Sequence, residues 1–354
     1  MKLFLFFIAF FHFSASLDPP FGALKIQGKF LTAANGTAVS LRGMSLMGSN
    51  YHPQFWNEET VRQLKCFWNV NIIRAPITPK SKCCGGWFAD PSQPIDNPWE
   101  WKSTRDREFD RLKQVVDACV KYGIYVIIDW HIFDYGNTTL EQGREFFANV
   151  SQTWGNLEPL DLIMAFLKNS PHVLFEIWNE PKCSWPIVKS YAENVIDLIR
   201  TNSPNNIIIV GTPTYSQRVD TASLDPIAKS NIAYTLHYYA ATHKGTQRNQ
   251  TLSAINNGLP VFITEYGTVD ALGAGEVNVN SSIAWWNLAD ENKISYVNWG
   301  VFPSDATPPG SAAFITGTTN LTINDPTNWT PSGKLVNQKY FNTVQYSNNF
   351  GCTA

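Results

Sequence analysis

The chain has 354 residues, of which 44% are hydrophobic, 14% are aromatic and only 16% are charged. Such a composition can bury a large core, and it excludes a disordered, collagen-like or coiled-coil protein. The 27 basic and 29 acidic residues leave a formal charge of −2, so no strongly basic face is expected and nucleic acid or an anionic membrane is a poor candidate partner.

The N-terminus has the pattern of a secretory signal peptide. Lys2 precedes an apolar run of 11 residues at positions 3–13, and the small residues at 14–16 form a signal-peptidase site. A membrane anchor or a buried helix is the alternative, but the run is far shorter than the roughly 20 residues needed to span a bilayer. We therefore expect residues 1–16 to be removed and residues 17–354 to form a secreted, extracellular domain that does not bind membranes.

Short β-rich runs alternate with helical stretches along the rest of the chain. Strands are predicted at 39–46, 71–77, 124–130, 173–178, 207–211, 233–237, 261–265 and 295–299. Helices are predicted at 58–68, 106–122, 160–169, 187–201 and 281–292, and Gly123 ends the clearest of them. Eight strand–helix units favour a single-domain (β/α)8 barrel over a doubly wound sheet, because no Gly-rich phosphate-binding turn follows any strand.

Cysteines and glycosylation sequons agree with an extracellular product. The six cysteines permit three disulfides, and the adjacent Cys83 and Cys84 are expected to bond to different partners; buried free thiols are the alternative. The cysteine spacing matches no zinc site, and we expect neither a metal nor a cofactor. Asn-X-Ser/Thr sequons occur at Asn35, Asn137, Asn149, Asn249, Asn280, Asn320 and Asn328.

The 13 tryptophans are more than a core of this size needs. An indole ring in a wet groove presents a flat apolar face that suits the apolar face of a sugar ring. Composition alone therefore favours a carbohydrate, and we expect a polysaccharide partner and a monomeric protein.

Polar and aromatic residues replace the apolar pattern near the ends of six predicted strands. Catalytic groups of a (β/α)8 barrel project from these C-terminal strand ends. The second strand holds Arg74, and the other five endings lie at 129–131, 178–181, 236–239, 264–267 and 298–300. Six such endings on one rim predict a functional site there.

Two of these endings carry a carboxylate, Glu180 and Glu265. Cleavage of a glycosidic bond needs such a pair, because one carboxyl group protonates the leaving oxygen while the other attacks the anomeric carbon or activates water. Strands four and seven face each other across an eight-stranded barrel, so both side chains can reach one bond. The alternative is that either glutamate is a structural ion-pair partner of Arg74.

The segment 177–181, Ile-Trp-Asn-Glu-Pro, resembles the acid/base motif of glycoside hydrolase family 5. The resemblance runs in order and with similar spacing over residues 25–345, through 41–45, 71–74, 128–131, 234–243, 263–268, 296–299 and 331–333. It is closest to the bacterial-type endoglucanase branch that also occurs in plant-feeding invertebrates.

This resemblance implies a retaining mechanism with Glu265 as the nucleophile and Glu180 as the acid/base, about 5 to 5.5 Å apart. Arg74 would hold Glu265 ionised, and Asn179 would bind the 2-hydroxyl of the sugar being cleaved. The other supporting and substrate-binding positions that it implies are His131, His237, Tyr239, Trp299, Tyr51 and Ala271. Structural histidines and an ordinary core tryptophan are the alternatives for His131, His237 and Trp299.

Several positions depart from the family pattern. Met47 stands where histidine is common, Tyr51 where a stacking tryptophan is common, and Thr78 where tyrosine is usual. A lysine that usually follows the last tryptophan is missing from 301–306. All these positions bind remote sugars, so the resemblance predicts the chemistry more firmly than the substrate.

The sequence therefore leaves three candidate functions. The first is an endo-β-1,4-glucanase acting on cellulose or related plant β-glucans. The second keeps the chemistry but acts on xylan, xyloglucan or mannan. The third is an inactive barrel that binds glycan, and the intact pair of Glu180 and Glu265 argues against it.

Overall fold

The computed structural model describes residues 17–90, 92, 103–136, 139–154, 170–343 and 350–352. Eight strands form its centre: β3 (Arg42–Leu46), β4 (Ile72–Ile77), β5 (Tyr125–Trp130), β6 (Val173–Glu176), β7 (Ile208–Val210), β8 (Ile232–Tyr239), β9 (Val261–Gly267) and β10 (Ser295–Val301). They pair in parallel and close a barrel in the order β10-β3-β4-β5-β6-β7-β8-β9. The predicted (β/α)8 class is confirmed.

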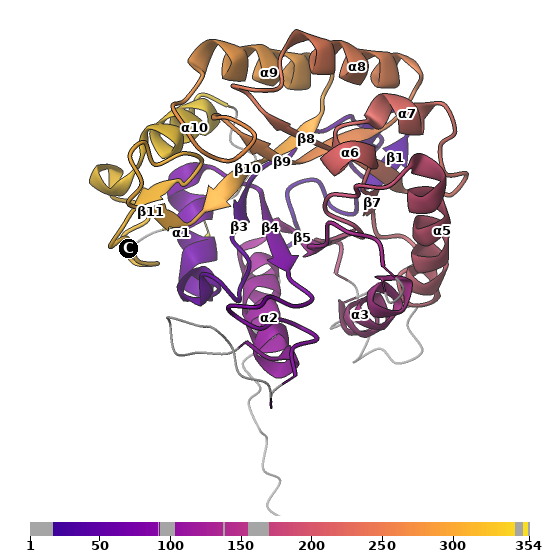
Figure 1. The fold of residues 1–354 in the computed structure, drawn as a ribbon, viewed down its shortest axis with the longest axis horizontal. Coiled ribbons are helices and arrows are strands. Elements are labelled where there is room, and N and C mark those ends of the chain that lie inside the picture. Colours follow the sequence, from indigo (N-terminus) through magenta and orange to yellow (C-terminus); the bar gives the residue numbers. More distant parts are fainter. Residues whose placement is uncertain are drawn as a thin grey trace, which may run out of the picture.

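Helices surround the barrel (Figure 1). Their bounds are α1 (Glu58–Trp68), α2 (Arg105–Tyr122), α3 (Thr139–Trp154), α5 (Trp185–Asn202), α6 (Pro213–Ser216), α7 (Val219–Ser223), α8 (Gly245–Asn256), α9 (Val279–Glu291) and α10 (Pro331–Phe341). Four predicted helices appear as α1, α2, α5 and α9, whereas the one predicted at 160–169 lies outside the described residues. In the described part of the chain, no helix combines the length and apolarity needed to cross a membrane.

Local signals explain where the helices begin and end. The side chain of Asn57 caps α1 by accepting a hydrogen bond from Thr60 N, and Gly123 ends α2 in a left-handed conformation with φ 65°. Short elements complete the described fold: the antiparallel pair β1 (Lys25–Gln27) and β2 (Phe30–Thr32), the pair β11 (Pro303–Ser304) and β12 (Phe314–Ile315), and the 3-10 turns η1 (Pro53–Phe55) and η2 (Pro326–Asn328).

Side chains along each strand point alternately outward, toward the helices, and inward, where they fill the barrel in two layers. Odd and even positions of a strand face opposite sides, so Ile73 and Ile77 of β4 pack outward in the core shared with the helices. Ile72 joins a separate apolar cluster that includes Tyr125, while Arg74, two residues further along β4, is fully buried. An apolar layer therefore fills the lower barrel, and charged residues begin above it.

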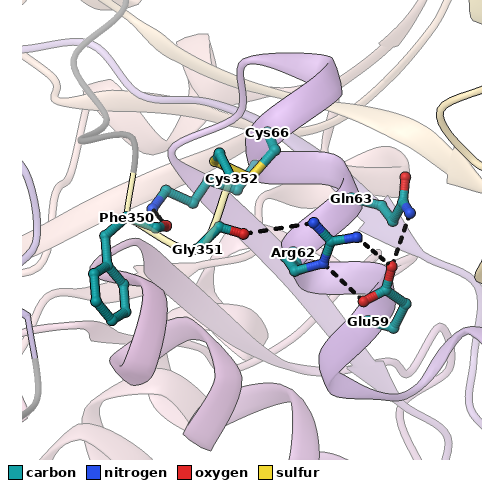
Figure 2. The surroundings of a disulfide bond; sticks show 8 residues. Glu59, Arg62, Gln63, Cys66, Phe350, Gly351 and Cys352 are labelled. Carbon is teal, nitrogen blue, oxygen red and sulfur yellow. Dashed lines mark hydrogen bonds and ion pairs between the residues drawn. A yellow bond between two sulfur atoms is a disulfide. The ribbon is translucent and has the colours of Figure 1, made fainter. Parts of the chain in front are cut away.

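A disulfide ties the C-terminal segment to the first helix. Cys66 of α1 bonds Cys352, 286 residues away in sequence (Figure 2). Beside it, the Arg62 guanidinium donates to the carbonyl of Gly351 at 3.5 Å and forms an ion pair with Glu59 at 2.7 Å. The Cys66–Cys352 disulfide therefore encloses almost the whole barrel in one covalent loop.

The second disulfide joins Cys83 directly to Cys84. The expectation that these neighbours bond to different partners is therefore wrong, and two of the three disulfides that the six cysteines permit are formed. Reciprocal backbone hydrogen bonds between Ser81 and Gly85 close a tight turn that carries both cysteines, and this turn brings no other cysteine beside them. The remaining two cysteines are free thiols: Cys119, which is buried, and Cys183, which is half-buried.

Removing the long-range disulfide is expected to destabilise the protein strongly. A cross-link that closes a long loop restricts the unfolded chain, so Cys66→Ser with Cys352→Ser should cost about 3 to 5 kcal/mol. For a chain of this size that loss lowers Tm by roughly 5 °C. Calorimetry checks it, with Cys83→Ser plus Cys84→Ser as the control, because that disulfide closes no loop. Equal losses in the two double variants would contradict the argument.

Candidate active site

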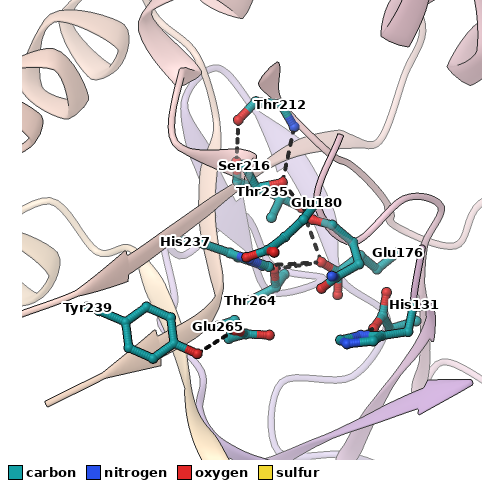
Figure 3. Close-up of polar contacts among 12 residues, drawn as sticks. His131, Glu176, Glu180, Thr212, Ser216, Thr235, His237, Tyr239, Thr264 and Glu265 are labelled. Carbon is teal, nitrogen blue, oxygen red and sulfur yellow. Dashed lines mark hydrogen bonds and ion pairs between the residues drawn. The ribbon is translucent and has the colours of Figure 1, made fainter. Parts of the chain in front are cut away.

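Glu180 and Glu265 meet at the C-terminal end of the barrel (Figure 3). Backbone hydrogen bonds from Glu180 N to Ile132 O at 3.0 Å hold the segment after β6 against the segment after β5. Glu265 lies within β9, in register with His237 of β8. One side-chain atom each of Glu180, His237 and Glu265 lies within 4.8 Å of the others. The two predicted carboxylates are therefore neighbours.

Glu265 is held as a carboxylate. Its Oε2 accepts from Arg74 Nη1 at 3.0 Å, and its Oε1 accepts from the Tyr239 hydroxyl at 2.8 Å. Burial alone would raise the pKa of Glu265, but the positive charges of His237 and Arg74 outweigh burial and lower it. Burial and the nearby Glu265 charge raise the pKa of Tyr239 far above its ordinary value, so this phenol stays a proton donor.

Arg74 is itself fixed by two further carboxylates. Its Nε contacts Glu176 Oε2 at 2.7 Å and its Nη2 contacts Asp129 Oδ2 at 2.9 Å, and all three side chains are fully buried. Burial raises the pKa of Asp129. Burial also acts to raise the pKa of Glu176, but the Arg74 charge dominates and the pKa falls to about 2. Arg74 thus pairs with Asp129 and Glu176 as well as with Glu265, and among the described residues it forms no ion pair with Glu180.

Asn179 has one bound and one unbound side-chain atom. Its Oδ1 accepts from Arg74 Nη2 at 2.6 Å, which orients the amide. Its Nδ2 is buried and has no partner among the described residues. The carbonyl of Asn179 also accepts from Ser216 Oγ at 2.6 Å. The amide nitrogen is therefore a fixed donor beside Glu180, as the predicted contact with a sugar hydroxyl requires.

His237 lies between Glu180 and the buried charged residues around Arg74. Its Nδ1 contacts Glu180 Oε1 and its Nε2 contacts Thr264 Oγ1, each at 2.9 Å, while the Thr264 hydroxyl donates to Glu176. Burial acts to lower the pKa of His237, but the negative charges of Glu265, Glu176 and Glu180 raise it to about 9. At neutral pH both ring nitrogens carry protons and donate.

This protonation state bears on metal binding. Glu180, His237 and Glu265 are close enough together to offer three ligand atoms to one ion. A histidine ligates a metal only through an unprotonated nitrogen, whereas both nitrogens of His237 are engaged as donors. The cluster therefore suits acid–base chemistry better than metal coordination at neutral pH.

A cavity of about 450 Å³ lies at this end of the barrel, and its lining includes Ile132, whose carbonyl accepts from Glu180 N. His131 forms part of its wall, is fixed by Asp129 at 2.7 Å, and stacks on Trp299 with ring centroids 5.6 Å apart and planes within 4°. Trp299 is only half-buried and faces this cavity, so it is not an ordinary core residue. Tyr51, together with Met47, Thr78 and Phe133, also lines the cavity.

Ala271 is the predicted position that the described contacts do not bring to the carboxylates. It is exposed in the loop after β9, and its backbone N–H donates to Thr242 Oγ1 at 2.9 Å. Conversely, Glu176 and Thr264 belong to the site but were not predicted. A charged residue inside the apolar run at 173–178 is the signal that could have identified Glu176.

The raised pKa of His237 predicts a pH-dependent stability. An unfolded histidine titrates near 6.5, whereas in the fold the pKa is about 9. The stabilisation is therefore complete below pH 6.5 and is lost as pH rises through about 9. We expect the difference in unfolding free energy between wild type and His237→Gln to shrink by at most about 3 kcal/mol over this range.

Urea unfolding at a series of pH values measures this difference. His243→Gln is the matched control, because burial lowers the pKa of His243 to about 4 and this side chain is already neutral above pH 6.5. Its difference from wild type should stay constant in the alkaline range. A His237→Gln difference that grew with pH would contradict the assigned protonation state.

Comparisons with known proteins agree with this geometry. The family described as Cellulase (glycosyl hydrolase family 5) matches residues 32–304. Endoglucanase Z of Dickeya dadantii is 37% identical over 87% of this chain and 65% of its own length. An endoglucanase of Clostridium saccharobutylicum is 35% identical over 79% of this chain and 57% of its own length. The chain thus spans less than two thirds of these relatives.

Solved structures of cellulases superpose on nearly the whole of this chain. Cellulase Cel5C_n superposes with a TM-score of 0.78 and 36% identity, covering 93% of this chain and 96% of that structure. The catalytic domain of Thermobifida fusca endoglucanase Cel5A has a TM-score of 0.76 and 28% identity, covering 91% and 99%. The barrel described here therefore corresponds in extent to the catalytic domain of the Thermobifida protein.

Proposed function

The chain belongs to the cellulase family, glycosyl hydrolase family 5, and on this basis we propose that it is a secreted endo-β-1,4-glucanase. It hydrolyses internal bonds of cellulose or related plant β-glucans by a retaining double displacement. The observation that carries the proposal is the pairing of Glu180 with Glu265 at the C-terminal rim of the barrel, with carboxylate oxygens within 4.8 Å. Retaining pairs stand about 5 to 5.5 Å apart, and inverting pairs about 6.5 to 9.5 Å apart.

In the first step Glu265 attacks the anomeric carbon while Glu180 gives its proton to the leaving oxygen. The lowered pKa of Glu265 keeps the nucleophile ionised. Arg74 and the Tyr239 hydroxyl hold one carboxylate oxygen each, which fixes the direction of attack. The free Nδ2 of Asn179 donates to the 2-hydroxyl of the same sugar.

In the second step a water molecule takes the place of the leaving group and attacks the anomeric carbon, Glu180 accepts a proton from this water, and the bond between the carbon and Glu265 breaks. The His237 contact to Glu180 Oε1 at 2.9 Å orients this carboxyl group in both steps. Water attacks from the face that the leaving group left, so the β configuration is restored. The chemistry uses side chains of the chain itself and needs no cofactor.

The substrate assignment is supported by the cavity at the C-terminal end of the barrel. Trp299 and Tyr51 give its wall aromatic faces, and such faces suit the apolar face of a glucose unit. The Thermobifida fusca Cel5A domain has been solved with cellotetraose. The relatives in Dickeya and Clostridium are named endoglucanases. A polysaccharide partner, a monomeric state and secretion after removal of residues 1–16 are part of the same proposal.

The stereochemistry of the first product tests the mechanism. Proton NMR of a fresh cellotetraose digest should show the β anomer before mutarotation, because both displacements occur at one carbon. An initial α anomer would exclude Glu265 as nucleophile. Reducing-sugar release from carboxymethyl cellulose, xylan, xyloglucan and mannan then tests the substrate, and the highest rate is expected on the cellulose derivative. No release from any polymer would overturn the enzymatic proposal.

A further inference from the structure

A second cavity, of about 490 Å³, opens at the opposite end of the barrel. Its lining includes Ser40 and Arg42, where β3 begins, and Lys293, just before β10. Glu180, which follows β6, and Glu265 in β9 lie at the C-terminal end of the barrel, so the proposed reaction does not use this cavity. Its volume falls within the roughly 300 to 1,000 Å³ of pockets that hold small ligands.

The walls of this cavity differ in character. Phe21, Val39 and neighbouring small residues contribute apolar lining, and Arg42, Asp290 and Lys293 contribute charged lining. Arg42 uses Nε and Nη2 toward Tyr296 and Asp290, and no described residue accepts from its Nη1. A lining that combines apolar surface with a free donor suits a sugar ring, which has an apolar face and a rim of hydroxyls.

Asn35 stands at the edge of this cavity in the sequon Asn35-Gly36-Thr37. The residue is exposed in a tight turn, in which Ala33 N donates to Thr37 O and Gly36 N donates to Ala33 O, each at 2.9 Å. Its Oδ1 accepts from Thr37 N at 3.0 Å. This contact fixes the carbonyl oxygen, and no described residue accepts from Nδ2. The nitrogen that would carry a glycan is therefore uncommitted.

The other sequons differ in this respect. Asn320 Nδ2 donates to Asn57 at 3.2 Å and Asn328 Nδ2 donates to Thr322 at 3.1 Å, so one hydrogen of each amide is held in the fold. Asn149 is half-buried within α3. The remaining three are Asn249 on α8 and Asn280 on α9, which are exposed but do not line this cavity, and Asn137, which lies outside the described residues.

We propose that Asn35 carries an N-linked glycan whose innermost sugar lies in this cavity. The inference rests on the proposed secretion, because the modification requires a eukaryotic secretory pathway. The donor is an oligosaccharide linked to a lipid diphosphate. The Asn35 amide nitrogen forms a bond to the anomeric carbon, the bond from that carbon to the lipid diphosphate oxygen breaks, and the amide loses one proton.

Glycopeptide mass spectrometry of protein secreted from yeast tests occupancy. A host leader in place of residues 1–16 makes the test independent of the native signal and of catalytic activity. Wild type should carry a glycan at Asn35, and Asn35→Gln and Thr37→Ala should each lose this one glycan. An unmodified Asn35 in secreted protein that is glycosylated at Asn249 or Asn280 would overturn the proposal.

The rate of enzymatic deglycosylation tests the position of the sugar. A peptide amidase should remove the Asn35 glycan from folded protein about tenfold more slowly than the glycans at Asn249 and Asn280, because covering roughly 60 Å² of apolar sugar surface is worth that factor. Heat-unfolded protein should lose all glycans at similar rates. Ala34→Trp keeps the sequon but fills the exposed edge of the cavity, and it should abolish the protection. Equal rates in folded wild type would contradict burial of the sugar.

Discussion

Replacing Glu265 by glutamine is expected to abolish turnover while the barrel stays folded. The amide has the size of the carboxylate but neither its charge nor its nucleophilicity, so no covalent intermediate forms. Loss of a nucleophile lowers kcat by at least about four orders of magnitude. Arg74 keeps Asp129 and Glu176 as ion-pair partners, so its buried charge stays compensated in the variant.

Steady-state kinetics on cellotetraose measure the loss of turnover. Calorimetric titration with the same sugar measures whether binding persists. Binding should persist, because the cavity beside Trp299 is unchanged. Glu108→Gln is the matched control: Glu108 is another fully buried glutamate, but it lies on α2 and is hydrogen-bonded by Ser103. This control should keep its activity. More than a few per cent of wild-type kcat in Glu265→Gln would remove it from the role of nucleophile.

The fold was predictable because its signals are local and repeated. Alternating apolar runs and helical periodicity recur along the chain, and all eight predicted strands have a counterpart in the barrel. Of the described helices, α3, α6, α7, α8 and α10 were not predicted. The sequences of α8 and α10 carry few regularly spaced apolar residues. These two helices cover the barrel through tertiary packing, which outweighs a weak local pattern.

The site was predictable to the extent that it lies at strand ends. Glu180 and Glu265 follow apolar runs and carry a recognisable motif, so the sequence predicts them as a pair. Glu176 was missed because it sits inside a strand, where burial would normally exclude a charge; its partner Arg74 comes from another strand, 102 residues earlier. Such a pair becomes visible only when the barrel closes.

The adjacent disulfide shows a further limit of sequence reasoning. Counting six cysteines suggests three bonds, but pairing depends on which sulfur atoms the backbone brings together. A turn closed by Ser81 and Gly85 brings Cys83 to Cys84, and Cys119 remains buried alone on α2. Neither outcome follows from spacing.

Glu180→Ala is expected to affect the two chemical steps differently, depending on whether the leaving group must be protonated. With cellotetraose the leaving group must be protonated, so loss of the general acid should lower the rate by about 10²- to 10⁴-fold or more. Dinitrophenyl β-cellobioside has a leaving group that departs as an anion, so its first step should survive. The second step, which needs Glu180 as base, then becomes limiting, and kcat and KM should fall together.

Added azide distinguishes this role from a structural one. A small anion that needs no general base can occupy the space vacated by the Glu180 side chain and attack the glycosyl enzyme, giving β-cellobiosyl azide and restoring kcat on the dinitrophenyl substrate. The retained β configuration would require that Glu265 had formed the intermediate. The matched control is His237→Gln, which removes the hydrogen bond to Glu180 Oε1 but leaves the carboxyl group in place, so azide should not accelerate it. If azide failed to accelerate Glu180→Ala, or gave the α product, Glu180 would not be the acid/base of a retaining pair.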